Sequence, residues 1–311
     1  MKLIDLAGAD GKPRKKQKSD VHGWLILDKP VGMTSTHAVS VAKRVFNARR
    51  AGHAGTLDPL ASGLLPIAFG EATKTVPFVM EGRKRYVFTV RWGEERDTDD
   101  SEGTVTGRSD QRPDAAAVRS IVPQFLGEIE QVPPRYSAIK VAGERAYDLA
   151  RDGELVELAA RTAEVYRLDI VSARDADHTV FAAECGKGTY VRALARDMGR
   201  ALGCFAHVSA LRRTAVGPFC EQHARKVEAI EGSPAAAELL LPVEAGLAEL
   251  PALRVSAADA GRLARGQSVL LRGRDTPALT GLAYACSHAS LVALVEVEHG
   301  TLKPRRVFNI R

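Results

Sequence analysis

Cysteine is scarce in this sequence, and its few copies are scattered. The 311 residues contain four cysteines with no CxxC pair and no framework spacing: Cys185, Cys204, Cys220 and Cys286. Disulfide scaffolds and zinc ribbons need cysteines paired at regular spacing, so both classes are excluded. We therefore expect structural thiols in a reducing compartment, and a cytoplasmic location.

Signals for metals and membranes are also missing. The eight histidines form no HxxxH or HExxH pattern, so the sequence predicts no metal site. No apolar run approaches the length of about 20 residues that spans a bilayer. The basic cluster near the N-terminus has no apolar stretch behind it, which is unlike a signal peptide. We expect neither a membrane segment nor a cofactor.

Positive charge is in moderate excess. The formal net charge is +6, which points to an anionic partner. Residues 1–20 are predicted to form a disordered basic tail, and both loose contact with polyanions and improved solubility fit its composition.

Hydrophobic patterns predict a mixture of strands and helices. In WLILDKPVGMTS (24–35), an apolar strand runs into a Lys-Pro-x-Gly turn, and Ser35 or Thr36 then caps a helix. Residues 85–93, RYVFTVRWG, alternate as a strand does. The acidic run ERDTDDSEG (95–103) lacks the spacing of a calcium loop, so it predicts a solvated hairpin turn.

The middle of the chain predicts two helices. Residues 131–154 combine an extended Pro-rich entry with an amphipathic helix, and residues 179–190 form a strand ending in a Gly-Lys-Gly turn. The next helix has one apolar face, and every fourth position of another face is an arginine: Arg192, Arg196 and Arg200. With only Asp197 nearby, these arginines predict a positive ridge suited to phosphates. An ordinary solvated face would show the same spacing.

From about residue 250 the chain changes character. Ser256 and Asp259 form a capping box that opens a short helix ending at Gly266. Short alternating strands follow, in SVLLRG, SLVALVEVE and RRVFNI. This pattern predicts a small β-rich module.

The stretch AGHAGTLDPLASGLLPIAFGEATK (51–74) places Asp58 among glycines, prolines and small residues. Locally, Asp58 and Pro59 resemble an N-cap and a first helical position, which would open a short helix through Leu60, Leu64 and Leu65. A functional carboxylate is the other interpretation, and the dipeptide alone leaves both open.

Several segments, taken in order, resemble the TruB family of pseudouridine synthases. GHAGTLDPLASGLLPIAFGEATK resembles its catalytic signature, and LILDKPVGMTS its Lys-Pro motif. RWGEERDTDDSEG resembles its GxxTDTxDxxG segment, with Arg96 where threonine is usual. VPPRYSAIKVAGERAYDLARDG is similar to its RNA-gripping insertion, GKGTYVRALARDMGRALG to the segment with its active-site arginine, and AHVSALRRTAVGPF to the strand that follows.

The similarity runs from about residue 22 to 220 and continues more weakly to LKPRRVFNIR. Ala54 stands where threonine is frequent, and residues 272–290 depart from the C-terminal RNA-binding module of the family.

The resemblance implies roles for individual residues. Asp58 would be the catalytic carboxylate, paired with Arg192, and Tyr86 would pack on the target base and take part in proton transfer. Tyr190 and Leu211 would line the pocket. The strand pattern of Tyr86 alone would equally fit a core tyrosine.

Five further positions have a less specific implied role. His53 matches a histidine that meets displaced nucleotides, although a histidine in a loop often has no function. Lys29 matches a buttress behind the catalytic loop, and it could instead contact RNA. RNA binding or structural support is expected for Lys74, Arg196 and Arg200.

The resemblance also implies a fold and a reaction. We expect an α+β pseudouridine synthase fold, a mixed and mostly antiparallel central sheet with flanking helices, over residues 21–249. Residues 131–154 would form the RNA-gripping insertion, and 250–311 a PUA-like RNA-binding module. The implied reaction flips uridine 55 out of the T loop of tRNA, detaches the uracil from C1′, turns it and rejoins it through C5.

The expected partner is therefore tRNA, through its T-stem and loop, without a membrane or an obligate protein partner, and we expect a monomer. Two alternatives are an RNA-binding or RNA-folding protein without turnover, and a guide-dependent pseudouridine synthase. The set of Asp58, Tyr86 and Arg192 argues against the first alternative. The insertion and the lack of a long lysine-rich tail argue against the second.

Overall fold

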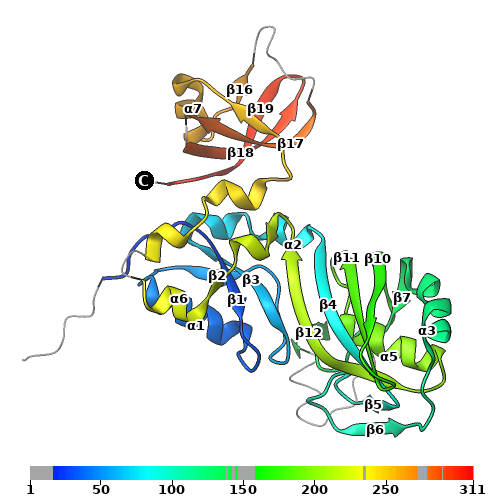
Figure 1. Ribbon diagram of the computed structural model, residues 1–311. Helices are drawn as coiled ribbons and strands as arrows, with labels where there is room; N and C mark the ends of the chain where they lie inside the picture. The colour runs from blue at the N-terminus through cyan, green and yellow to red at the C-terminus, as the bar shows by residue number, and fades with distance from the viewer. Residues whose placement is uncertain are drawn as a thin grey trace, which may run out of the picture.

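The computed structural model describes residues 17–137, 139–141, 144–145, 158–233, 236–271, 279–288 and 290–310. Two β-sheets organise most of them, a ten-stranded sheet in the larger part of the chain and a five-stranded sheet in the C-terminal part (Figure 1). Within the described ranges, no helix is long and apolar enough to cross a membrane.

The larger sheet is mixed and mostly antiparallel, which confirms the predicted fold class. Its strands follow the order β14-β1-β3-β12-β4-β11-β10-β7, with β2 paired to β3 and β13 to β12. The strands are β1 (Gly23–Lys29), β2 (Ala51–His53), β3 (Ser62–Phe69), β4 (Lys84–Trp92), β7 (Gly127–Gln131), β10 (Arg161–Ala173), β11 (His178–Cys185), β12 (Ala206–Val216), β13 (Phe219–Cys220) and β14 (Arg225–Lys226).

Helices pack on one face of this sheet and share one apolar core with it. These are α1 (Ser35–Val45), α3 (Ala115–Ile121), α5 (Val191–Ala201) and α6 (Val227–Glu231). In Figure 1, α1 and α6 lie beside β1, whereas α5 and α3 lie beside β11, β10 and β7. This part also contains the short helix α2 (Val76–Glu81) and the 3-10 helices η1 (Gly70–Lys74), η2 (Val122–Phe125), η3 (Glu221–His223), η4 (Ala236–Leu239) and η5 (Val243–Leu247). Two hairpins lie outside the sheet: β5 (Glu94–Arg96) with β6 (Val105–Arg108), and β8 (Lys140–Val141) with β9 (Glu144–Arg145).

The alternating segment at 85–93 forms β4, as predicted, in the middle of the sheet. Phe88 pairs with Phe181 on β11 and with Leu211 on β12. The rings of Phe88 and Phe181 stack with centroids 5.5 Å apart. Successive side chains of a strand point to opposite faces, so Phe88, Val90 and Trp92 enter the core shared with α5, whereas Val87 points the other way and is 37% exposed.

The short helix predicted after Asp58 is wrong, because residues 62–69 form strand β3. This strand pairs with β1 from Gly63 to Phe69, and Gly63 has φ +101°, a backbone conformation incompatible with a helix. Leu64 and Leu65 point to different apolar cores on opposite faces of the sheet. A strand covered on both faces has a continuous apolar sequence, which periodicity cannot distinguish from a buried helix.

The N-cap of α1 also differs from the prediction. Thr34 caps the helix, and its side chain accepts a hydrogen bond from the His37 amide at 3.1 Å. Neither Ser35 nor Thr36 has this position, because Ser35 is buried and bonded to another segment. A sequence with three consecutive hydroxyl-bearing or capping-competent residues does not reveal which of them starts the helix.

Some predicted features lie outside the described residues. These are residues 1–16 of the basic tail, most of the amphipathic helix predicted within 131–154, and part of the departure at 272–290. Residues 17–20 of the predicted tail are described, and the Ser19 amide bonds to the Asn47 carbonyl at 2.8 Å.

The C-terminal module is β-rich, as predicted. It comprises α7 (Ala257–Ala264) and the strands β15 (Ala252–Arg254), β16 (Val269–Leu270), β17 (Gly281–Ser287), β18 (Ser290–Glu298) and β19 (Thr301–Val307), in the order β15-β17-β18-β19-β16. Ser256 caps α7 as predicted, since its hydroxyl accepts from the Asp259 amide at 3.1 Å. The capping box is not complete, because the Asp259 carboxylate accepts from the Ser256 hydroxyl at 2.7 Å and not from the Ser256 amide.

Residues 307–309 return to the larger part of the chain. Lys74 pairs with Glu71 at 2.6 Å and donates to the Val307 carbonyl at 2.8 Å, and Glu71 accepts from the Asn309 amide at 2.8 Å. Phe308 enters an apolar cluster shared by the module and the large sheet. Lys74 therefore links η1 to the C-terminal module.

We expect Phe308→Ala to lower the free energy of unfolding by about 3–5 kcal/mol. The Phe308 ring is only 6% exposed, so its removal would leave a cavity between the module and the sheet. Urea denaturation of the full chain would measure this loss. The matched control is Ile310→Ala, at a residue two positions further on that is 38% exposed. It should change the free energy of unfolding by no more than about 0.5 kcal/mol. Equal effects of both substitutions would contradict the contribution of this contact.

Candidate active site

Asp58 lies on the loop between β2 and β3, and both of its chain neighbours are held in place. The Leu57 amide donates to the Ser35 hydroxyl at 2.9 Å, and that hydroxyl lies 2.8 Å from the Leu57 carbonyl. On the other side, the Pro59 carbonyl accepts from the Gly32 amide at 2.8 Å. The backbone around the carboxylate is therefore fixed by the turn after β1 and by the first residue of α1.

Lys29 lies behind this loop. Its side chain is fully buried, and its ammonium donates to the carbonyls of Met33 at 2.7 Å and Pro30 at 2.9 Å, and reaches that of Pro59 at 3.5 Å. Burial lowers the pKa of Lys29 to about 8, although the nearby charge of Asp58 acts in the opposite direction. This geometry favours the buttress over an RNA contact, because the ammonium does not reach the surface.

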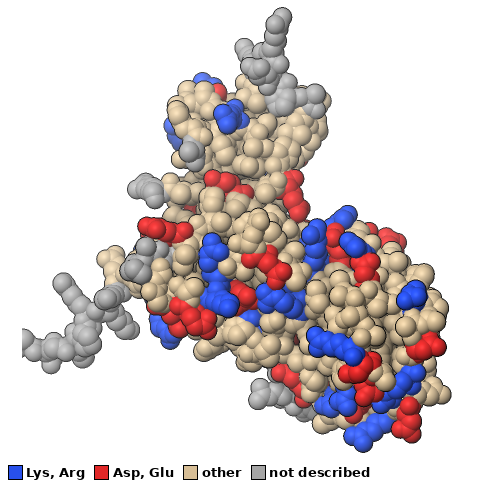
Figure 2. All heavy atoms as spheres, in the orientation of Figure 1, with Lys and Arg blue, Asp and Glu red and all other residues tan. Residues whose placement is uncertain are grey.

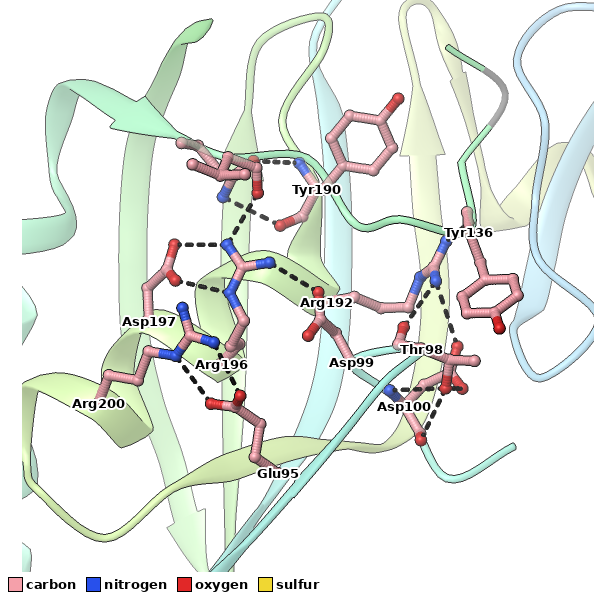
Figure 3. A network of polar contacts seen from close by, with 12 residues as sticks. Glu95, Thr98, Asp99, Asp100, Tyr136, Tyr190, Arg192, Arg196, Asp197 and Arg200 are labelled. Atoms are coloured by element: carbon pink, nitrogen blue, oxygen red, sulfur yellow. Dashed lines mark hydrogen bonds and ion pairs between the residues drawn. The ribbon is translucent and has the colours of Figure 1, made fainter. Parts of the chain in front are cut away.

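Arg192 in the first turn of α5 pairs with Asp58. Its Nε lies 2.9 Å from Oδ2 of the carboxylate; the Arg192 side chain is 5% exposed, while that of Asp58 is 34% exposed. The other two guanidinium nitrogens donate to the carbonyls of Thr98 at 2.8 Å and Tyr136 at 2.9 Å (Figure 3). The nitrogen that bonds to Thr98 also lies 3.5 Å from Oδ2 of Asp100. The arginine is thus held by three segments, and the carboxylate it orients still faces solvent.

The acidic run 95–103 is a hairpin turn, but the prediction that it is solvated is wrong. Asp99 and Asp100 are 4% and 3% exposed. Both face α5, where Asp99 pairs with Arg196 at 2.8 Å. Burial raises the pKa of Asp99 to about 6, and the charges of Arg196 and Arg192 oppose that rise.

The free positive ridge predicted on α5 is also wrong. Arg196 is 7% exposed and pairs with Asp197 as well as Asp99. Arg200 binds both carboxylate oxygens of Glu95, at 2.7 and 2.8 Å (Figure 3). These arginines attach the hairpin to the helix, which supports their structural role. On the face shown in Figure 2, basic and acidic side chains are intermingled.

The predicted pocket residues belong to three elements. Tyr86 lies on β4, Leu211 on β12, and Tyr190 at the N-cap of α5. The charge of Asp58 acts on both phenols, and burial raises the pKa of each, so both are neutral at physiological pH. The side chain of Gln131 fixes Tyr190, accepting from its amide at 2.8 Å and donating to its carbonyl at 3.1 Å.

His53 ends β2, five positions before Asp58, where it pairs with Ile67 and is partly exposed. It therefore lies at the start of the loop that carries Asp58. Lys74 lies elsewhere, in η1 against the C-terminal module, so the structure does not bring it into this site.

Sequence reasoning missed two residues of the site, Ser35 and Arg213. Arg213 is 2% exposed and donates to carbonyls of the loop that carries Asp58. A signal for it exists in the sequence: in the strand ALRRTAV the alternation places Leu211 and Arg213 on the same, apolar face. A charged residue on a core face is buried only when it has a partner.

Comparisons with known proteins agree with this geometry. The N-terminal domain model of the TruB family pseudouridylate synthases matches residues 43–191, and the model of the tRNA pseudouridylate synthase B C-terminal domain matches residues 192–248. The structure is similar to that of an archaeal box H/ACA sRNP Nop10-Cbf5 complex, with a TM-score of 0.68 and 25% identity, over 93% of this chain and 86% of that one. Fold and site together define a pseudouridine synthase.

Relatives place the chain within that class. The tRNA pseudouridine synthase B of Rhodopseudomonas palustris is 61% identical, over 97% of this chain and 85% of the relative. That of Bradyrhizobium diazoefficiens is also 61% identical, over 96% of this chain and 89% of the relative. The chain belongs to the TruB family.

Proposed function

We propose that this protein is a tRNA pseudouridine synthase that isomerises uridine 55 of the T loop. Relatives of this high identity carry the name tRNA pseudouridine synthase B. The observation that carries the proposal is the Asp58–Arg192 pair, in which a buried arginine orients a carboxylate that remains accessible.

The reaction breaks the C1′–N1 bond and forms a C1′–C5 bond, while C5 loses its proton and N1 gains one. Asp58 is the group that acts on the nucleotide, and a carboxylate can attack either C1′ or C6. Because its loop is held on both sides, little orientation has to be gained during the reaction. Tyr86, neutral and beside the pocket, would pack on the uracil and carry a proton.

The target base is stacked in the T loop, so it has to be flipped out before the carboxylate can reach it. Flipping costs a few kcal/mol, which stacking on an aromatic side chain recovers in part. His53, at the start of the catalytic loop, is placed to meet nucleotides displaced with the target. Recognition of the T-stem would follow the shape of its backbone, through lysine and arginine side chains.

We further propose that the protein acts alone, as a monomer in the cytoplasm. The four cysteines are free, two of them buried, which suits a reducing compartment. The guide-dependent alternative would require an RNA guide and partner proteins for turnover.

An assay with transcribed tRNA distinguishes the stand-alone synthase from a guide-dependent synthase and from an RNA-binding protein without turnover. We expect the purified protein, with no guide or second protein, to release tritium from 5-labelled uridine and to modify a single position. A transcript with cytidine at position 55 should release none. Activity that requires an added guide RNA would favour the guide-dependent alternative, and binding without any release would favour an RNA-binding protein.

A further inference from the structure

Arg213 connects the two ends of the loop that carries Asp58. Its guanidinium donates to the carbonyls of Gly55 and Thr56, each at 3.1 Å, and to that of Leu64 at 2.8 Å. The first two precede the carboxylate by three and two positions, and the third follows it by six. One buried cation thereby closes the loop at its base.

The backbone of Arg213 is as firmly placed as its side chain. β12 runs parallel to β3 at this point, with Arg213 opposite Gly63. The approach is so close that a Cβ at Gly63, which has φ +101°, would lie 2.2 Å from the Arg213 carbonyl oxygen. Only glycine fits there, so the guanidinium starts from a fixed point on the sheet.

The contacts of Arg213 complement those described above. Ser35, Lys29 and Gly32 hold the residues directly beside Asp58, whereas Arg213 holds the ends of the loop. Gly55 has φ +98°, and a glycine whose carbonyl is unrestrained could rotate and carry the carboxylate with it. The Arg213 charge also faces the phenol of Tyr86, where it opposes the pKa rise caused by burial.

We propose that Arg213 is a positioning residue for the isomerisation, one that holds the Asp58 loop at the distance the flipped ribose requires. This inference rests on the proposed function. A displacement of about 1 Å at a reacting group costs on the order of 100-fold in rate. Substrate binding, which depends on contacts along the whole T-stem, does not depend on this arginine.

The neighbouring Arg212 provides a matched control. It belongs to the same strand but contacts other elements, pairing with Asp28 at 2.9 Å and Glu221 at 2.8 Å, and its side chain is 36% exposed. It makes as many hydrogen bonds as Arg213, but none of them reaches the catalytic loop.

The deciding variant is Arg213→Lys, which keeps the buried charge and loses the planar array of donors. We expect a folded protein with kcat lowered at least about 10-fold and KM for tRNA within about twofold. Arg213→Met should lower kcat by about 100-fold or more. Arg212→Lys should change neither parameter by more than about twofold. Amide exchange of residues 54–61, measured in the same proteins, should accelerate only in the Arg213 variants.

The inference would be overturned if Arg213→Lys kept the full wild-type kcat. It would also be overturned if Arg213→Lys and Arg212→Lys changed kcat and KM by the same factors. An Arg213→Lys protein that does not fold would also overturn it, since the residue would then serve stability alone. If the wild-type protein shows no turnover, the proposed function fails, and the exchange measurement still tests whether Arg213 holds the loop.

Discussion

Asp58→Asn is expected to abolish pseudouridine formation while tRNA still binds. Asparagine keeps the size of the side chain and an oxygen that can accept from Nε of Arg192, so the loop and its partner remain in place. What disappears is the negative charge and the nucleophile that the rearrangement requires. Tritium release from 5-labelled uridine should fall by at least about 10⁴-fold. The Kd for tRNA should stay within about threefold, because phosphate contacts dominate binding.

Asp177→Asn is the control for this substitution. Asp177 also pairs with an arginine, Arg112, but in the turn between β10 and β11. We expect its activity to equal that of the wild type. Tritium release by Asp58→Asn at the rate of Asp177→Asn would remove Asp58 from its proposed role.

Arg192→Met is expected to damage both catalysis and stability. The substitution leaves Asp58 without its orienting partner, and the buried carboxylate of Asp100 without a nearby cation. Breaking a buried ion pair by removing one partner costs about 3–5 kcal/mol, so thermal denaturation should show a lowered Tm. We expect the single-turnover rate of tritium release to fall by about 10²–10³-fold.

Two comparisons separate these effects. Arg200→Met removes an arginine two turns further along α5, where the side chain is 54% exposed; it should cost at most about 1 kcal/mol and leave the rate unchanged. Arg192→Lys should recover part of the stability but little of the rate, because an ammonium cannot donate to the Asp58, Thr98 and Tyr136 oxygens together. Full activity in Arg192→Lys would show that charge alone, without geometry, is sufficient.

Some of the site was predictable because its signals are local. The alternation of 85–93 placed Tyr86 on the apolar face of β4, and the helical spacing after 190 placed Arg192 in the first turn of α5. The loop with Asp58 was identified through its motif, since glycines and prolines mark an irregular segment whatever surrounds it. In each case the nearest neighbours in sequence are also the neighbours that determine the local conformation.

Other features depend on partners that lie far away in the sequence. Arg196 and Arg200 had the spacing of a free basic stripe, yet their acids come from a hairpin about 100 positions earlier. The same hairpin was expected to be solvated, because acidic turns generally are. Arg213 escaped notice for a similar reason, since the carbonyls it binds carry no signal in their side chains.

The sequence by itself determined the family motifs, the strand and helix periods, and the identity of the groups able to react. Tertiary structure decided which charges meet, which are buried, and what holds the reactive loop. The physical reason is that periodicity reports only how a segment divides its residues between two faces. Pairing energies and burial depend on the element that covers each face, and only the folded chain brings that element into contact.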